Sequence, residues 1–235
     1  MPLSIIVLAA GQGKRMHSTL PKVLHRLAGR PLLAHVLQTA QALDPVRTVV
    51  VHGHGGADVK SAFADAGVTW VEQAAQQGTG HAVAQALPEI PPGDDVLILY
   101  GDVPLIAVDT LRQLVQAAHG GLAILSAEAL DPSGYGRVVR GAQGEVLRVV
   151  EQRDATPDEL ALREVNAGFL CAPAKRLGKW LGDVRNHNAQ KEYYLTDVVG
   201  LAVRDGVAVA AVKARAWAEV AGVNSKRELA ALERE

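Results

Sequence analysis

Residues Leu8–Met16 read LAAGQGKRM, a glycine loop placed directly after the apolar run from Leu3 to Ala10. The run is typical of a buried strand. Gly11 and Gly13 carry no side chains, so backbone N–H groups in the loop can approach phosphate oxygens closely. A strand that leads straight into such a loop favours a nucleotide-binding α/β fold, although the same residues could form a plain strand-to-helix turn.

Two common glycine-loop motifs do not fit this stretch. The dinucleotide-binding motif needs a third glycine where Met16 stands, and an acidic ribose ligand where the second expected strand ends in 52–54, His-Gly-His. The phosphate-binding loop of many ATPases needs Gly-Lys-Ser or Gly-Lys-Thr at its spacing, and neither follows. The loop instead supplies the cations Lys14 and Arg15, with Lys22 shortly after them.

Outward from the loop, short β-branched runs alternate with segments of helical period, the pattern of βαβ units and a mostly parallel sheet with helices on both faces. In the first half the expected strands are Ser4–Ala10, Thr48–His52, Thr69–Glu72 and Val96–Tyr100. The expected helices are Pro31–Leu43, Ala57–Ala66, Thr79–Leu87 and Val108–Ala118.

Beyond Gly120 the pattern turns to strands broken by turn-rich stretches, which predicts a small β-hairpin insertion beside the main sheet. The strands expected in this half are Leu122–Leu130, Arg137–Val139, Val146–Arg153, Val165–Cys171 and Val207–Val212. The helices expected here are Ala174–Leu181, Leu195–Arg204 and the final segment Ser225–Glu235.

The composition excludes several classes of protein. Of 235 residues, 49% are hydrophobic and 21% charged, which is a globular balance, and the net charge of −1 gives no bulk attraction to nucleic acid or to an anionic membrane. Phosphate binding must then come from a local site. The single cysteine, Cys171, permits no internal disulfide, which is consistent with a protein of the reducing cytoplasm. We expect Cys171 to be a buried residue of a strand. Leu3–Ala10 is too short to span a membrane and has no basic segment before it.

Several motifs together identify a family. LAAGQGKRM followed by LPKVL at Leu20–Leu24 is similar to the signature of the sugar-phosphate nucleotidyltransferases. Further matches follow in the same order: EQAAQQGTGHA, LYGDVPL, DPSGYGR, VVEQRDA, EVNAGF, HNAQKEYYLTD and EVAGVNS. Over essentially the whole chain they resemble the uridyltransferase domain of the bacterial bifunctional enzymes that make UDP-N-acetylglucosamine. The resemblance implies a Rossmann-like nucleotidyltransferase fold, with residues 1–235 forming one domain.

The resemblance also implies the reaction. A uridylyl group would pass from UTP to N-acetylglucosamine 1-phosphate, giving UDP-N-acetylglucosamine and pyrophosphate, with magnesium as cofactor. The product would serve peptidoglycan and lipopolysaccharide synthesis in the cytoplasm. Transfer to another sugar phosphate or from another nucleotide is the nearest alternative, and an inactive nucleotide-binding sensor on the same fold is another.

Roles are implied for individual residues as well. Arg15, Lys22 and Asp102 would be catalytic, and Asp102 and Asn224 would hold the metal. Gln73, Gly78 and Thr79 would contact uracil, and Gly136, Glu151 and Asn166 the amino sugar. The substrate-binding residues that complete the implied set are Leu8, Ala9, Ala10, Gly11, Tyr100, Gly101, Tyr194 and Thr196.

Asp102 and Asn224 each allow a second interpretation. Asp102 follows the expected strand Val96–Tyr100, where ligands of open α/β sheets gather, but an aspartate there can also cap a helix or shape a turn. Asn224 could be the N-cap of the last helix. Magnesium prefers a few oxygen ligands together with substrate phosphates and water, which suits one carboxylate and one amide oxygen. Acid–base catalysis by His52 or His54 is not expected, because the attacking phosphate oxygen is already ionised near neutral pH.

Full-length members of the resembled family carry a second domain, a left-handed β-helix of hexapeptide repeats that acetylates glucosamine 1-phosphate and forms trimers. Here only the helical segment Ser225–Glu235 follows Asn224. Hexapeptide coils bury their faces only by stacking on further coils. We therefore expect neither acetyl transfer nor the trimer from the present chain.

Overall fold

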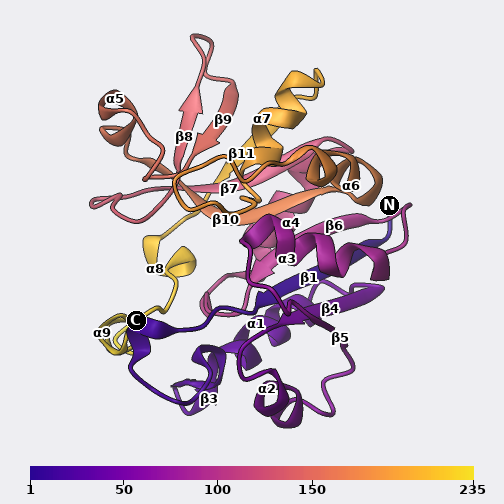
Figure 1. The fold of residues 1–235 in the computed structure, drawn as a ribbon, viewed down its shortest axis with the longest axis vertical. Coiled ribbons are helices and arrows are strands. Elements are labelled where there is room, and N and C mark those ends of the chain that lie inside the picture. The colour runs from indigo at the N-terminus through magenta and orange to yellow at the C-terminus, as the bar shows by residue number, and fades with distance from the viewer.

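A nine-stranded mixed sheet forms the centre of the computed structural model, which describes residues 1–235 (Figure 1). Its main path runs in the order β11-β7-β10-β6-β1-β4-β5, and β8 joins β10 and β9 at the side. The strands of the main path are β1 (Leu3–Ala9), β4 (Arg47–His52), β5 (Thr69–Glu72), β6 (Asp95–Tyr100), β7 (Leu122–Glu128), β10 (Glu164–Pro173) and β11 (Val209–Lys213). Every one of them except β10 runs in the same direction, because β10 alone pairs antiparallel with both of its neighbours.

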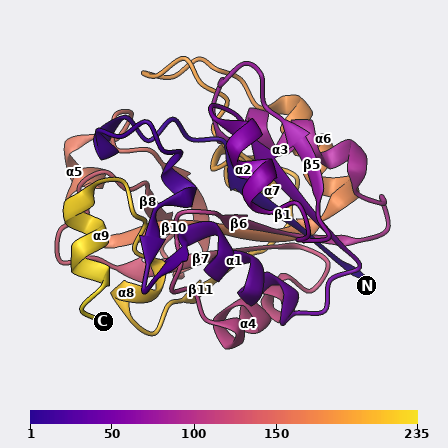
Figure 2. The same cartoon turned by 90° about the horizontal axis from the view of Figure 1, so that it is seen from below.

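Helices cover both faces of this sheet, as the continuous burial of β1 requires. Ile5 and Val7 face a core shared with α1 (Leu32–Gln41), α2 (Gly56–Ala62) and α4 (Val108–Ala118). Ile6 and Leu8 face a second core of equal size, shared with α3 (Thr79–Ala86), α6 (Ala174–Asp183) and α7 (Asp197–Arg204). Figure 2 shows α1 and α4 on one side of the sheet and α3 and α6 on the other. The predicted α/β class with helices on both faces is confirmed.

The hairpin of β8 (Arg137–Arg140) and β9 (Val146–Val150) projects from the sheet, as predicted for the insertion (Figure 1). β8 touches the main path only through one bridge to β10. Two other small elements have no counterpart in the prediction: the ribbon β2 (Arg26–Leu27) and β3 (Arg30–Pro31), and helix α5 (Pro157–Leu160). Helix α8 (Trp217–Val220) is likewise additional.

Several predicted bounds differ from the structure. α2 ends at Ala62, because Phe63 leaves the helical conformation and packs against the core. The strands predicted to run to Leu130 and Arg153 end at Glu128 and Val150, where turns begin. Strand β11 starts two residues later than predicted, and α7 starts at Asp197.

The C-terminal helix α9 (Lys226–Leu232) packs against the region of the glycine loop. Leu232 and Val223 share a small core with Met16, Leu27 and Leu32. In Figure 1 the C-terminus accordingly lies close to the first segments of the chain. This packing brings Asn224 to the end of the sheet at which β1 and β6 finish. Among the helices there is none whose length and apolarity would suffice to cross a lipid bilayer.

Candidate functional site

The glycine loop leaves β1 and closes around the side chain of Lys22. Gly13 has φ 60°, and a Cβ atom there would lie only 2.9 Å from Cβ of Lys22. At Gly11 a Cβ atom would meet Nζ of Lys22 at 3.8 Å. Met16, at the end of the single turn Lys14–Met16, is 1% exposed and anchors the loop in the small core under α9. The residue that breaks the dinucleotide motif is therefore a packing residue.

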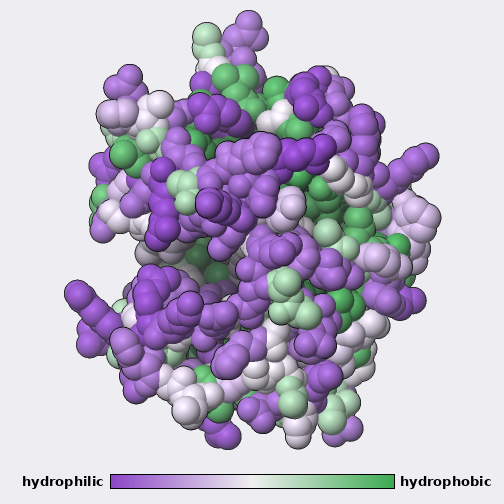
Figure 3. All heavy atoms as spheres, in the orientation of Figure 1, coloured by the Kyte–Doolittle hydropathy of each residue, from purple (hydrophilic) through white to green (hydrophobic).

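A cavity of about 530 Å³ lies where this loop meets the start of α3 and the end of β6. The predicted substrate-binding residues that line it are Leu8, Ala9, Ala10, Gly11, Lys22, Gln73, Gly78, Thr79, Tyr100 and Asp102. The space-filling view in Figure 3 shows a hollow between the upper and lower parts of the molecule. Segments more than ninety residues apart in the chain thus contribute to one site.

The wall formed by Gln73, Gly78 and Thr79 is held rigidly. Gln73 is buried, and its amide nitrogen donates to the carbonyl of Gly78 at 3.0 Å. The backbone N–H of Leu195 donates to the Thr79 hydroxyl at 3.1 Å. Gln76, which was not predicted, donates to the carbonyl of Ala10 at 2.8 Å and so joins this wall to the glycine loop. Fixed polar groups of this kind can discriminate one base edge from another.

The predicted metal ligands converge on one cation, the ammonium group of Lys22. Nζ of Lys22 donates to a carboxylate oxygen of Asp102 and, at 3.1 Å, to the side-chain oxygen of Asn224. Asp102 follows β6, and its carbonyl accepts from the backbone N–H of Val223 at 2.8 Å, which brings the neighbouring Asn224 into place. The side chains of Lys22 and Asp102 are only 12% and 15% exposed.

Neither capping alternative describes these two residues. Helix α4 begins after Ala107 without a side-chain cap, so Asp102 caps no helix. The N-cap of α9 is Ser225, whose hydroxyl accepts from the backbone N–H of Glu228. No group of three or more His, Cys, Asp or Glu side chains is arranged to hold a metal. One carboxylate oxygen and one amide oxygen that already share a cation fit magnesium, which takes its other ligands from phosphate and water.

A second group of predicted residues gathers around Glu151. A carboxylate oxygen of Glu151 accepts from the Thr196 hydroxyl at 2.9 Å, and the backbone N–H of Asn166 donates to the carbonyl of Gly136 at 2.9 Å. A Cβ atom at Gly136 would stand 3.4 Å from the same Glu151 oxygen. The side-chain oxygen of Asn166 is buried without a hydrogen-bond partner. Such an orphaned acceptor is available to a ligand hydroxyl or amide.

Tyr100 links the two groups. Its ring packs on the bare backbone of Gly168, where a Cβ atom would be 2.7 Å from the ring, and meets Phe169 edge-on at 6.0 Å between centroids. Burial raises the pKa of its hydroxyl, and the negative charges of Glu151 and Asp102 raise it further. Tyr100 therefore remains a neutral hydroxyl between the two carboxylates. Gly101, next in the chain, packs beneath the site, where a Cβ atom would lie 3.3 Å from Ala9.

Burial shifts the pKa of two carboxyl groups beside this second group. Burial raises the pKa of Glu151, the hydrogen bond from Thr196 opposes that shift, and the charges of Asp154 and Glu192 add to it. Burial, followed by the charges of Glu151 and Asp154, raises the pKa of Asp197 to about 6. These two carboxyl groups therefore hold a proton more tightly than exposed carboxyl groups do.

Eight predicted residues do not line the 530 Å³ cavity, namely Arg15, Gly101, Gly136, Glu151, Asn166, Tyr194, Thr196 and Asn224. Arg15 is exposed and forms no ion pair within the chain. Burial raises the pKa of the Tyr135 hydroxyl, and the positive charge of Arg15 acts against that shift. The buried Tyr194 and the predicted Glu151 both line a separate cavity of about 450 Å³, together with Asp154 and Asp197.

The structure adds cavity-lining residues that were not predicted, namely Gln12, Lys14, Val23, Gln76, Ala82 and Glu192. Each lies within or beside a quoted motif, but spacing alone does not say which way its side chain points.

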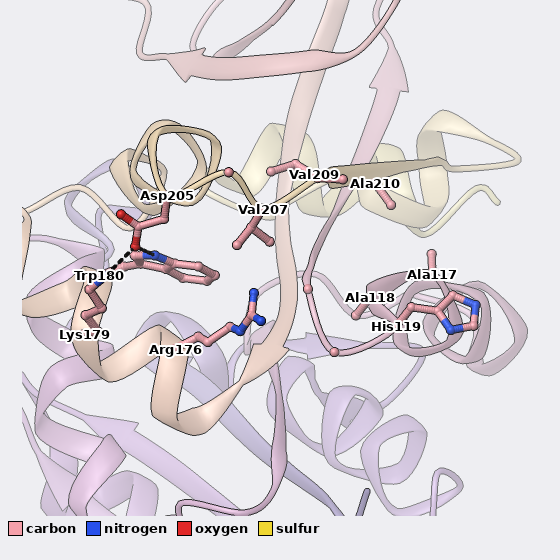
Figure 4. Close-up of a pocket in the computed structure, with 14 residues that line it drawn as sticks. Ala117, Ala118, His119, Arg176, Lys179, Trp180, Asp205, Val207, Val209 and Ala210 are labelled. Carbon is pink, nitrogen blue, oxygen red and sulfur yellow. Dashed lines mark hydrogen bonds and ion pairs between the residues drawn. The ribbon is translucent and has the colours of Figure 1, made fainter.

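Another cavity, of about 810 Å³, is lined by none of the predicted site residues (Figure 4). It lies at the edge of the sheet where β7 and β11 begin, opposite the ends of β1 and β6. Asp205 there accepts from Lys179 at 2.7 Å and from the indole N–H of Trp180 at 3.0 Å.

A comparison with known families matches residues 5–177 to the MobA-like NTP transferase domain. The chain belongs to this family. It is 56% identical over 99% of its length to "Bifunctional protein GlmU" of Chromobacterium violaceum, and 56% identical over 99% to the protein of that name from Aromatoleum aromaticum. In both cases it spans 51% of the relative's length. The resemblance inferred from the motifs is confirmed.

The fold of this family member also matches a solved structure. A UDP-glucose pyrophosphorylase complexed with UDP-glucose superposes with a TM-score of 0.80, covering 100% of this chain and 98% of the other at 14% identity. At that identity the match concerns the fold alone, and it confirms the nucleotidyltransferase architecture.

Proposed function

We propose that this NTP transferase domain transfers a uridylyl group from UTP to N-acetylglucosamine 1-phosphate and releases pyrophosphate. The observation that carries the proposal is the convergence of Lys22, Asp102 and Asn224 at the mouth of a cavity walled by the glycine loop and by Gln73–Thr79. The two relatives at 56% identity support it, since their similarity extends over 99% of this chain.

In the proposed reaction, an oxygen of the sugar phosphate attacks the α-phosphorus of UTP. A bond forms between that oxygen and phosphorus, and the bond from phosphorus to the bridging oxygen of the β-phosphate breaks, so the electron pair leaves with pyrophosphate. Negative charge accumulates on the phosphates during this step, and positioned cations lower its energy. Lys22 and the free, exposed Arg15 supply those cations, and the loop backbone from Leu8 to Gly11 supplies N–H donors.

Asp102 and Asn224 would hold magnesium, which when bound neutralises phosphate charge and fixes the orientation of the triphosphate. The other protein groups act by position. The amide nitrogen of Gln73 bonds to the Gly78 carbonyl and to the His81 ring, so its side-chain oxygen is the atom left for the base. Glu151 and the unpartnered oxygen of Asn166 accept from the hydroxyl and amide groups of the sugar.

The proposed product serves the synthesis of peptidoglycan and lipopolysaccharide precursors, and we place the reaction in the cytoplasm. A reducing compartment agrees with the buried, unpaired thiol of Cys171.

The test is product analysis after incubation of pure protein with UTP, magnesium chloride and N-acetylglucosamine 1-phosphate. We expect UDP-N-acetylglucosamine and pyrophosphate in equal amounts, and no pyrophosphate when the sugar phosphate is left out. If UTP binds but neither product forms, the chain is a nucleotide-binding sensor on a transferase fold. If products form only with another sugar phosphate, the family assignment stands and the proposed substrate is wrong.

A further inference from the structure

Lys22 cannot bond to phosphate oxygens and to the proposed metal ligands at the same time. Its ammonium group should contact phosphate oxygens, yet it bonds to both Asp102 and Asn224. Those two oxygens are the ones proposed to hold magnesium. A compact, positively charged group therefore occupies the position between the metal ligands.

We infer that Lys22 is a stand-in cation: it holds Asp102 and Asn224 together while the site is free of metal, and it must leave them before a divalent ion can bind. This inference rests on the proposed function and concerns the order in which the site is loaded. Free magnesium alone competes poorly with the lysine. A metal–triphosphate complex competes well, because it brings the metal and at the same time offers phosphate oxygens to the displaced ammonium group.

The surroundings of Lys22 support this exchange. Its side chain is 12% exposed and passes beside Gly13, where a Cβ atom would stand 2.9 Å away, so its stem is confined. Its ammonium group lies next to Gly11, whose missing side chain leaves the path toward the glycine loop open. A short movement of Nζ along that path takes the charge from the carboxylate to the part of the cavity bounded by Leu8–Gly11.

Electrostatics gives the exchange a direction. A carboxylate that is 15% exposed would be poorly solvated without a partner, so the metal-free site is stabilised by the lysine. A divalent ion that enters while the lysine stays would meet a like charge at close range, which is strongly unfavourable where water is scarce. Binding of the metal and departure of Lys22 are therefore coupled.

The test measures Mn²⁺ binding to nucleotide-free protein by electron paramagnetic resonance, a readout that needs no turnover. Wild-type protein should bind Mn²⁺ weakly at this site. In Lys22→Met the competing charge is gone, and we expect the dissociation constant to fall by about tenfold or more. Adding Asp102→Asn to Lys22→Met should remove that gain, which shows that the ion sits at Asp102 and not at another carboxylate.

Lys14→Met is the matched control. Lys14 lines the same cavity but bonds to neither Asp102 nor Asn224, so its loss changes the general charge without vacating the metal position. We expect Mn²⁺ affinity to rise less than about threefold in this variant. Equal gains in Lys14→Met and Lys22→Met, no gain in Lys22→Met, or a gain that survives Asp102→Asn would each overturn the inference.

A measurement on the wild-type chain covers the case in which Lys22→Met does not fold. Acetylation of the Lys22 amine by a water-soluble reagent, followed by mass spectrometry, should become faster when saturating Mn²⁺ is added, because displacement exposes the ammonium group. An unchanged rate would contradict displacement. Absence of turnover with UTP in the product assay, with the Mn²⁺ and acetylation results as expected, would instead contradict the proposed function and leave the exchange intact.

Discussion

Among single residues, Asp102 gives the most direct test of the proposed metal site. Its carboxylate packs against no core side chain that needs it, and its partners are a lysine and, through the backbone, Val223. In Asp102→Asn we expect turnover to fall by about 10²-fold or more, since the charge that holds the proposed metal is lost. The chain should still fold, because asparagine keeps an oxygen that can accept from Lys22, but the unfolding temperature should fall because the poorly exposed ammonium group loses its counter-charge. Wild-type turnover at limiting magnesium would remove Asp102 from the metal site.

The raised pKa of Asp197 predicts how the stability of the fold depends on pH. Its pKa in the folded chain, about 6, lies above its ordinary value of 3.8, so the folded state holds this proton more tightly than the unfolded state does. The stability that the proton contributes is complete below about pH 4 and is lost as the pH rises through 6. Asp197→Asn should therefore raise the free energy of unfolding at pH 8 by about 1 kcal/mol, after allowance for solvent screening and for the N-terminus of α7. At pH 4 the gain should vanish.

Asp205 is the matched control for that experiment. Hydrogen bonds from Lys179 and Trp180 lower the pKa of its carboxyl, so its contribution to stability is present at neutral pH and fades as the pH falls. Asp205→Asn should lower the free energy of unfolding at pH 8, the opposite sign to Asp197→Asn. Urea denaturation at pH 8 and pH 4 measures both. A loss of stability at pH 8 in Asp197→Asn would show that its carboxylate is well solvated.

At the residue scale, ten of the residues predicted from motifs lie together in the lining of the 530 Å³ cavity, while their proposed contacts with substrate stay a prediction. The direction of a side chain is a different matter. Gln76 reaches back to Ala10, and Glu192 enters the cavity from a loop, through contacts that depend on the tertiary fold. Tyr194 sits in the predicted motif, yet its side chain lines the neighbouring cavity.

At the scale of elements, the spacing of hydrophobic residues predicted nearly every strand and helix, but it did not predict the direction in which β10 runs. Strand β10 is as apolar as its parallel neighbours, and nothing in its residues distinguishes an antiparallel neighbour from a parallel one once both faces are buried. Bounds failed where tertiary packing ended an element early, as Phe63 does for α2. The short α5 was missed, although Thr156 and Glu159 form a capping box at its start.

The turn before α3 yields a prediction at this scale. Gly78 has φ 106°, and a Cβ atom there would come within 2.7 Å of the Tyr193 carbonyl oxygen. Gly78→Ala should lower the free energy of unfolding by about 1–3 kcal/mol and weaken UTP binding, because the turn that carries Thr79 must shift. Gly93→Ala is the control, since no atom lies within 4 Å of the added carbon. Equal stability of the two variants by urea denaturation would show that the turn relaxes freely.

On the scale of the whole molecule, the site exists only because three distant segments meet. Lys22 comes from the short turn that follows the glycine loop, Asp102 from the end of β6 and Asn224 from the segment that α9 anchors on Met16 and Leu27. The family resemblance predicted that these three residues act together. The spacing of hydrophobic residues and the composition could not predict it, because each of the three residues considered alone could equally cap a helix or lie on the surface.

The most direct test of the central claim is a substrate panel that crosses UTP, GTP, CTP and dTTP with N-acetylglucosamine 1-phosphate, glucosamine 1-phosphate and glucose 1-phosphate. Pyrophosphate release with magnesium is measured for each pair as kcat/KM. The fixed Gln73 wall and the acceptors at Glu151 and Asn166 predict that UTP with N-acetylglucosamine 1-phosphate exceeds every other pair by about 10²-fold or more. A higher kcat/KM for any other pair, or no release from any pair, would contradict the account.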